Sequence, residues 1–310
     1  MLDSHSFCNL VTINCMAFVD EDGKLNKKGI LDAQRLNARL SYRVTLPVLE
    51  LPKWNAVQVR DRLLGLSLTG WIDMVNATNM STEEQRILLR ELKSVAVESA
   101  NEYADELGLN RSELITCVKP EGTLSLLPTV SSGLHANHSE YYIRRIRINA
   151  QDPLLKACEE LGYPIFPEVG QDIETCKTKV VEFPVKSPKG KTKYDISAIE
   201  QLEIYKMFME EYVQHNASNT ISVLRDEEWS DVVDWVYDNW DTVIGITFIS
   251  LDDSFYQLMP YESCTKEEYE ERKSKLKPIT NSVLSKYEKF DYLADDLEDD
   301  SCSSSVCAVR

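Results

Sequence analysis

The sequence predicts an α/β protein. Short apolar, β-branched runs alternate with segments whose apolar residues recur at helical spacing, an order typical of a mainly parallel sheet or barrel. With 310 residues, 43% of them hydrophobic, the chain can bury a large core. Residues 291–310 are instead rich in Asp, Glu and Ser, a composition that cannot offset the entropy lost on folding. We expect a folded part over residues 1–290 and a flexible tail over residues 291–310.

The first elements follow from apolar spacing and helix-end signals. Asn9 to Phe18 is apolar and β-branched, so it predicts a strand or the start of a buried helix. Asn26 to Leu46 predicts a helix. A long helix is expected from Ser81, a good N-cap followed by acidic residues, to about Leu107, where Gly108 ends it.

The later elements continue the alternation. Leu114 to Val118 is a short apolar run ahead of a Pro/Gly loop, and Tyr141 to Ile148 alternates like a strand. Two further helices and two further strands are expected at Ser197 to His215, Asp226 to Asn239, Thr220 to Leu224 and Val243 to Leu251.

The charge and composition of the chain indicate which binding partners and which cellular location to expect. The net charge of -17 argues against broad electrostatic binding to nucleic acid or to anionic lipid. No signal-peptide pattern and no apolar run of about 18 residues is present, so we expect a cytoplasmic protein without a membrane partner. Cysteines of a cytoplasmic protein are expected to be reduced, and those expected to be buried are Cys15, Cys117, Cys158, Cys176 and Cys264.

Two cysteines in the tail, Cys302 and Cys307, are separated by four residues that include three serines. A flexible spacer of this kind allows the two sulfurs to close a disulfide, as a thiol-disulfide carrier requires. Two other interpretations stay open: a zinc site, for which no second ligand pair is nearby, and unreactive tail cysteines.

The loop after Leu114 to Val118 has residue types suited to binding an anion. Glycine permits close backbone approach, hydroxyls donate hydrogen bonds, and successive backbone N–H groups can form a concave anion site. The pattern is neither a Walker loop nor a dinucleotide-binding glycine motif. The candidate phosphate-binding residues are Pro120, Glu121, Gly122, Thr123, Leu124 and Ser125.

Each of these features has a structural alternative. The loop can be an ordinary Pro/Gly turn. The basic residues Arg144, Arg145 and Arg147 can add charge to an anion site, or can lie on a strand face with acidic partners. The four histidines show no metal-ligand spacing, so no metal site is predicted at His5, His135, His138 or His215.

Four motifs occur in this order: KPEGTLSLLPTVSSGLH at residues 119–135, YYIRRIRI at 141–148, HNASNTISV at 215–223 and SLDDSFYQLMPYE at 250–262. Together they resemble motifs of ribonucleotide reductases. The particular resemblance is to the adenosylcobalamin-dependent (class II) ribonucleoside-triphosphate reductases, and it covers nearly the whole chain. It implies the second half of a ten-stranded α/β barrel of the reductase large-subunit type over residues 1–290.

The resemblance also implies roles for three cysteines. Cys8 matches one half of the cysteine pair that gives two electrons to the ribonucleotide. Cys302 and Cys307 match the tail dithiol that re-reduces this pair and is itself reduced by thioredoxin or a similar reductant. The implied reaction is reduction of ribonucleoside triphosphates for DNA replication, with adenosylcobalamin as the radical source.

The family's Asn-Pro-Cys-x-Glu motif, which carries the radical cysteine, is absent from this sequence. In the family, that motif, the partner of Cys8 and the nucleotide-specificity region belong to the N-terminal half. We therefore expect a split reductase or a truncated reading frame that is inactive without an N-terminal half. The alternatives are an inactive remnant and a non-catalytic assembly or phosphate-binding module.

Overall fold

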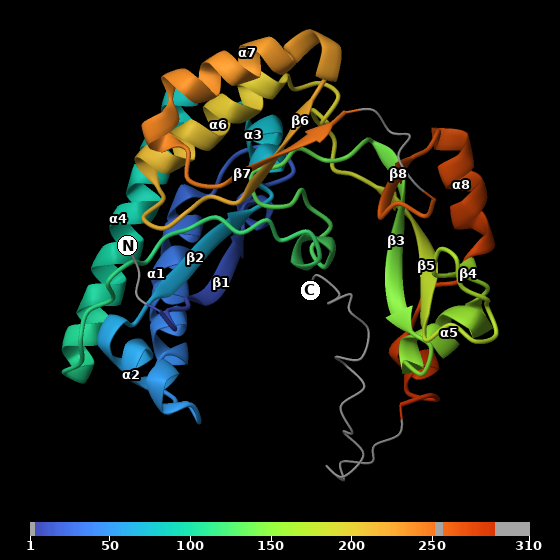
Figure 1. The fold of residues 1–310 in the computed structure, drawn as a ribbon, viewed down its shortest axis with the longest axis horizontal. Helices are drawn as coiled ribbons and strands as arrows, with labels where there is room; N and C mark the ends of the chain where they lie inside the picture. Colours follow the sequence, from blue (N-terminus) through green and yellow to red (C-terminus); the bar gives the residue numbers. More distant parts are fainter. Residues whose placement is uncertain (1–3, 252–256, 289–310) are drawn as a thin grey trace. The chain divides into compact units, whose positions relative to one another are not determined.

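The computed structural model describes residues 4–251 and 257–288, so Cys302 and Cys307 lie outside the described residues. The chain forms two compact units within these ranges. Unit 1 comprises residues 4–140 and 187–251, and unit 2 comprises residues 141–186 and 257–288. Figure 1 shows the course of the chain through both.

Unit 1 is built on parallel strands. β1 (Asn9–Asn14) pairs with β2 (Leu64–Thr69), and β6 (Asn219–Val223) pairs with β7 (Ile246–Ser250). Residues 115–118 connect the two pairs through parallel bridges, Leu66 to Thr116 and Val118 to Ala217. The extended segments thus follow the order β1, β2, 115–118, β6, β7, all parallel, which confirms the predicted α/β class for this unit.

Helices cover these strands (Figure 1). Asn26 caps the first helix, and Ser81 and Glu84 form a capping box at the start of the longest, which ends at Gly108. The helices of unit 1 are α1 (Lys27–Val44), α2 (Pro52–Asp61), α3 (Trp71–Thr78), α4 (Thr82–Leu107), α6 (Ala198–Glu211) and α7 (Arg225–Asp238). Three short 3-10 turns are η1 (Cys15–Phe18), η2 (Leu124–Leu126) and η3 (Trp240–Thr242).

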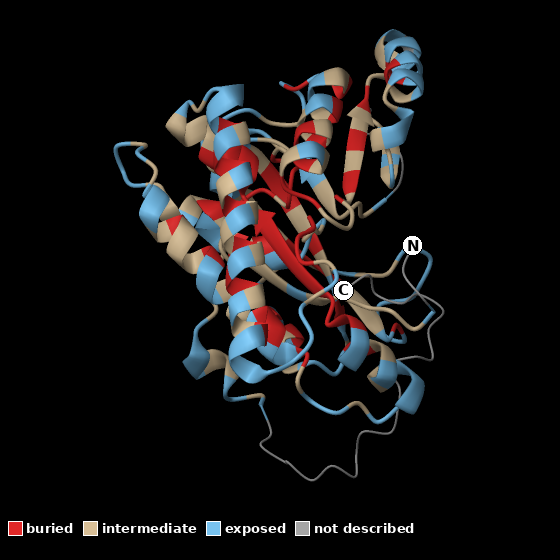
Figure 2. Cartoon of the chain, turned by 90° about the vertical axis from the view of Figure 1, so that its left-hand side faces the viewer, coloured by how far each residue is buried: buried red, intermediate tan, exposed pale blue. Residues whose placement is uncertain are grey.

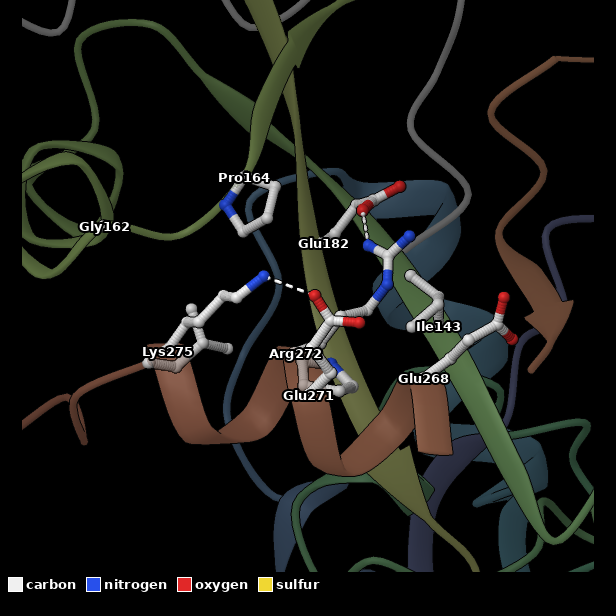
Figure 3. A pocket seen from close by; sticks show the side chains of 10 residues that line it. Ile143, Gly162, Pro164, Glu182, Glu268, Glu271, Arg272 and Lys275 are labelled. Carbon is white, nitrogen blue, oxygen red and sulfur yellow. Dashed lines mark hydrogen bonds and ion pairs between the residues drawn. The ribbon is translucent and has the colours of Figure 1, made fainter. Parts of the chain in front are cut away.

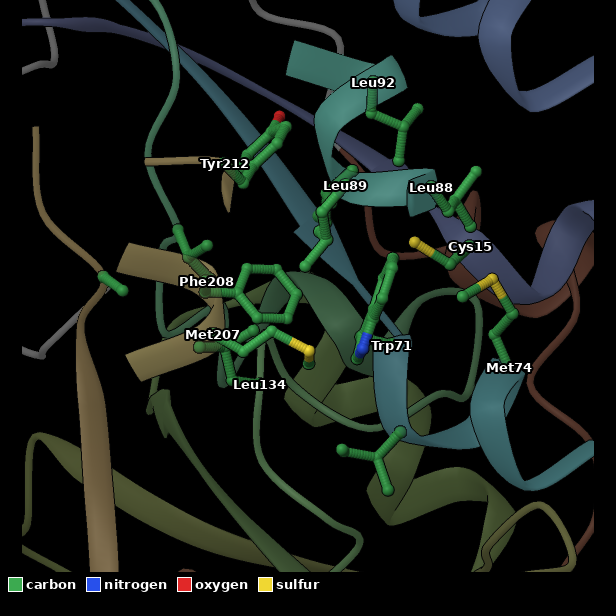
Figure 4. Close-up of a cluster of buried hydrophobic side chains, with 14 of the residues drawn as sticks. Cys15, Trp71, Met74, Leu88, Leu89, Leu92, Leu134, Met207, Phe208 and Tyr212 are labelled. Carbon is green, nitrogen blue, oxygen red and sulfur yellow. The ribbon is translucent and has the colours of Figure 1, made fainter. Parts of the chain in front are cut away.

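The main core of unit 1 lies around Trp71, which is fully buried (Figure 4). Its ring meets the Phe208 ring edge-on, with the centroids 5.0 Å apart. In a second cluster, Ala96, Ala100 and Ala104 of α4 lie at four-residue spacing beside Tyr42 of α1. These small side chains let the two helices pack closely. Figure 2 shows helices with buried and exposed sides, as expected for amphipathic helices on a sheet.

Unit 2 is a four-stranded antiparallel sheet in the order β4, β5, β3, β8. Its strands are β3 (Tyr141–Asn149), β4 (Ile165–Pro167), β5 (Thr178–Lys186) and β8 (Tyr261–Ser263), and its helices are α5 (Pro153–Leu161), α8 (Lys266–Lys275) and α9 (Asn281–Leu284). The expectation of a mainly parallel sheet is therefore wrong for this unit. Its core contains Ile148, Leu155, Cys158 and Val181.

Most expected elements are confirmed with small shifts at their ends. The stretch Asn9 to Phe18, for which strand and helix were both open, is a strand to Asn14 and a 3-10 turn after it. The helix expected to reach His215 ends at Glu211. None of the described helices combines the length and apolar composition that a membrane span needs.

Candidate functional site

The candidate phosphate loop follows the central strand segment of unit 1. The amide of Leu66 donates to the carbonyl of Ile115 (2.9 Å), and the amide of Cys117 donates to the carbonyl of Leu66 (3.0 Å). On the other side, the amide of Ser218 donates to the carbonyl of Val118 (2.9 Å). The loop therefore begins at the carboxyl end of a strand with hydrogen-bonded neighbours on both sides, a common place for ligand sites in parallel α/β folds.

The base of the loop is held by close backbone packing. Glu121 adopts a left-handed conformation with φ 52°, and the Ser125 amide donates to its carbonyl (3.0 Å). Gly133 also has a positive φ, 55°, and a Cβ there would lie 2.5 Å from the carbonyl oxygen of Lys119. Only glycine combines that conformation with so close an approach.

A buried carboxylate supports the second half of the loop. Asp73, near the start of α3, is 2% exposed. Its Oδ2 accepts from the Ser131 amide (2.6 Å) and its Oδ1 from Nδ2 of Asn137 (2.5 Å). Burial raises the pKa of Asp73, although both hydrogen bonds favour the ionised form. Thr69 adds a second anchor, because its hydroxyl donates to the Ser131 carbonyl (3.1 Å).

The predicted phosphate-binding residues differ in their access to solvent. Pro120, Gly122, Thr123 and Leu124 are exposed, and a Cβ at Gly122 would meet nothing within 4 Å. The side of Gly122 to which a Cβ would point thus faces open space. Ser125 is 2% exposed, so the loop presents the hydroxyl of Thr123 more openly than that of Ser125.

Glu121 is the acidic residue of this loop. Its Oε2 is buried with no hydrogen-bond partner among the described residues. Its charge is one cause of the raised pKa values of Cys15, Cys117 and Tyr212, all of them buried residues of unit 1. The carboxylate is acceptor-only when ionised, so only the backbone of Glu121 is suited to an anionic ligand.

Cys8, the predicted reducing cysteine, lies just before β1 and is half-buried. Cys117 approaches it from the other side of β2. Each of the two sulfurs lies 3.3 Å from the position that a Cβ on Gly65 would occupy. Burial raises the pKa of Cys117 to about 12, with the neighbouring Cys8 as the second cause. Sequence analysis missed this proximity because the two cysteines are far apart in the chain.

The environments of the remaining cysteines and of His135 are those of residues that stabilise the fold. Cys15, Cys158 and Cys176 are buried, as expected, whereas Cys264 is only half-buried. His135 accepts from the Thr220 amide at Nε2 (3.0 Å), which assigns the proton to Nδ1, facing the Ser132 carbonyl (2.8 Å). Burial lowers its pKa. The described residues contain no group of three or more His, Cys, Asp or Glu side chains arranged to hold a metal ion.

The three arginines of β3 have partners within unit 2, in line with the structural alternative. Arg145 pairs with Glu182 (2.8 Å), and both side chains are buried. Arg147 pairs with Glu168 (2.6 Å), and the Arg144 guanidinium lies 4.3 Å from the centroid of the Tyr261 ring. The charges of Arg145 and Arg147 are thus compensated by acidic partners in unit 2, whereas Arg144 contacts an aromatic ring and backbone carbonyls.

Unit 2 also contains a cavity of about 370 Å³ between its sheet and α8 (Figure 3). Glu182 lies at its wall and accepts from Arg272 (2.6 Å), and Lys275 pairs with Glu271 (2.6 Å). A second cavity, of about 310 Å³, is lined by residues that include Tyr163, Phe183 and Lys273. The charged groups named at the larger cavity neutralise one another.

Three known proteins that this chain resembles in sequence share one name. The chain is 30% identical over 248 residues to the adenosylcobalamin-dependent ribonucleoside-triphosphate reductase of Euglena gracilis, which covers 78% of this chain and 33% of that protein. It is 28% identical over 277 residues to a probable reductase of the same name from Dictyostelium discoideum, covering 86% of this chain and 34% of that protein. A putative reductase of the same name from Mycobacterium phage D29 is 27% identical and covers 98% of this chain and 44% of its own length.

A solved structure of a B-12 dependent (class II) ribonucleotide reductase has a similar fold. The TM-score is 0.72 at 23% identity, and the match covers 83% of this chain and 39% of that chain. No family model matches the chain. The chain therefore spans between 33% and 44% of the length of these proteins.

Proposed function

This chain is a homologue of part of the adenosylcobalamin-dependent ribonucleoside-triphosphate reductases, and from that premise we propose that it forms the C-terminal part of such an enzyme. The assembled enzyme would convert ribonucleoside triphosphates to 2'-deoxyribonucleoside triphosphates. The rest of the reductase would supply the radical cysteine.

The observation that supports this proposal is that both predicted sites lie on one run of parallel strands. Cys8 stands directly before β1, and the loop from Pro120 to Ser125 follows residues 115–118 of the same run of parallel strands. β1 and β7 are the two outer strands of that run. Outer strands need partners or cover, which supports one half of a ten-stranded barrel that other strands complete.

We assign the chemistry of this chain to thiols and backbone amides. The Pro120 to Ser125 loop holds the substrate phosphates through its N–H groups and the Thr123 hydroxyl. Cys8 and a second thiol together give two electrons and two protons to the ribose, the 2'-hydroxyl leaves as water, and the thiols become a disulfide. Cys302 and Cys307, outside the described residues, re-reduce that disulfide by exchange and then pass their own to thioredoxin or a similar reductant.

Exposed apolar side chains support a larger assembly. Leu36, Leu40 and Val44 recur at four-residue spacing on α1 and are 69%, 55% and 48% exposed. On α7, Trp229, Val233 and Tyr237 repeat the pattern at 47%, 49% and 81%. Two such stripes on one unit are surfaces that a partner normally covers, and we propose the rest of the reductase as that partner.

Adenosylcobalamin would supply the radical chemistry of the assembled enzyme. The cavities of unit 2, at about 370 and 310 Å³, are at the lower end of pockets for drug-sized ligands, too small for a corrin. The structure therefore offers no fitting site for the cofactor in these two cavities, and we assign none of their residues to it. The cytoplasmic location expected from the sequence stays a prediction.

The test is ribonucleotide reduction with adenosylcobalamin, thioredoxin, and ATP or CTP, first with this chain alone and then with the remainder of the reductase. Deoxynucleotide formation only in the mixture supports the proposal. Absence of product in both supports a remnant or a non-catalytic module.

A further inference from the structure

We propose that Cys8 and Cys117 form a reversible disulfide across Gly65, so that this chain contains a dithiol pair of its own in addition to the tail pair. The proposal deepens the proposed function. Only its consequence, that an oxidised Cys8 cannot reduce a ribonucleotide, rests on that function. The formation of the bond depends on the geometry of unit 1 alone.

The strand register brings the two residues to opposite sides of β2. Asn9 pairs with Leu64, so Cys8 stands one residue before the start of the β1–β2 ladder. Leu66 bridges to Thr116, so Cys117 follows that bridge directly. The two side chains thus reach toward β2 from its two neighbours.

Gly65 creates the space in which the sulfurs meet. A Cβ at this position would lie 3.3 Å from each Sγ and 2.4 Å from Cδ2 of Leu10. Any larger residue would therefore separate the thiols. Both sulfurs therefore lie on the face of the sheet to which a side chain at Gly65 would point.

The backbones must move for the bond to close. Neighbouring strands are about 4.8 Å apart, so strands on both sides of β2 are separated by roughly 10 Å, whereas disulfides join Cα atoms about 4.4–6.8 Å apart. Cys8 lies outside the β1 ladder and is the more mobile candidate. Its movement would displace Phe7, whose ring centroid lies 5.6 Å from that of Trp54.

The reaction is a thiol-disulfide exchange with a low-molecular-weight disulfide as the oxidant. Cys8, the more exposed thiol, attacks first, forms a mixed disulfide and releases one small thiol. Cys117 then attacks the Cys8 sulfur and releases the second small thiol, so two protein thiols become one disulfide. Cys117 is 3% exposed and holds its proton tightly. The second step is therefore slow, on the order of minutes to hours.

The experiment uses the full chain with Cys302→Ser and Cys307→Ser, which removes competing exchange by the tail. The reduced protein is incubated with oxidised glutathione, free thiols are alkylated under denaturing conditions, and peptides are mapped by mass spectrometry. We expect a Cys8–Cys117 cross-link and a change in Trp54 fluorescence that is lost in a Trp54→Phe variant. Cys15→Ala, which removes a buried thiol of the same unit, should retain the cross-link.

Two variants make the result decisive. Cys117→Ser should stop the reaction at the glutathione adduct of Cys8, and Gly65→Ala should lose the cross-link while keeping both thiols. A parent protein in which Cys8 carries only glutathione or stays reduced, with Cys117 alkylated, would overturn the proposal. No substrate or cofactor is present, so this outcome is independent of whether the reductase assay succeeds.

Discussion

Gly133 lies against the main chain of Lys119, so closely that a Cβ on the glycine would be 2.5 Å from the lysine carbonyl oxygen. This contact joins the two ends of the segment from Lys119 to Gly133, which contains the candidate phosphate-binding residues. The loop conformation therefore depends on a residue without a side chain, at a φ of 55°.

Gly133→Ala should destabilise unit 1 by about 2 kcal/mol, because alanine is strained at this φ and its methyl group meets a carbonyl that cannot move freely. Urea unfolding measures the loss. Gly122→Ala is the matched control in the same loop, since its Cβ would meet nothing within 4 Å and its φ is not positive. Equal losses in the two variants would show that the packing at Gly133 is not the cause.

Asp73→Asn should cost about 1–3 kcal/mol, because an amide offers one acceptor oxygen where Ser131 and Asn137 present two donors. The pH dependence should change as well. With a folded-state pKa above 3.8, Asp73 holds its proton more tightly in the folded chain, so its contribution to stability falls as pH rises from 3.8 through the raised pKa. The difference between variant and parent in unfolding free energy should therefore shrink over that interval, and a constant difference would contradict the raised pKa.

Glu182→Gln should strongly destabilise unit 2. Glu182 accepts from Arg145 and from Arg272 while 4% exposed, so the variant leaves the buried Arg145 guanidinium with the half-exposed Glu262 as its remaining acidic partner. Removing one member of a buried pair costs about 3–5 kcal/mol when the other charge is left uncompensated, so with Glu262 in place we expect a loss near the lower end of that range. Glu271→Gln is the control, because the Glu271–Lys275 pair is exposed and contributes little. Thermal or urea unfolding that ranks the two variants equally would refute this assignment.

Cys302→Ser or Cys307→Ser should abolish turnover with thioredoxin in the assembled enzyme and leave a single turnover intact. In the proposed reaction, the tail dithiol is needed only after the active-site disulfide has formed. Rapid-quench measurement of the first deoxynucleotide separates the two phases. Equal loss in the single-turnover and steady-state assays would remove the tail from the proposed role.

Local signals predicted much of unit 1. The long helix from Thr82 was predictable because Ser81 supplies a cap and Gly108 a stop. β2 was not expected, since all six residues of LGLSLT are buried and such a run shows neither strand nor helix periodicity. In unit 2, Pro184 lies within β5, and proline argues against a strand in sequence-based prediction.

The residues of the candidate site were proposed from the sequence, where they stay a prediction, whereas their geometry was not predictable. The exposed backbone at Gly122 and the buried side of Glu121 depend on a φ of 52° at Glu121, which the sequence does not signal. The meeting of Cys8 and Cys117 depends on strand order and on Gly65, both properties of the tertiary fold.

The most direct test of the central claim, that this chain is the C-terminal part of a ribonucleotide reductase, is the reconstitution assay with adenosylcobalamin, thioredoxin and ATP or CTP. We predict deoxynucleotide product when the remainder of the reductase is present, and loss of that product when Cys8 is replaced by Ser. A reconstituted mixture that binds nucleotide but forms no product, or one whose activity is unaffected by Cys8→Ser, would contradict the account.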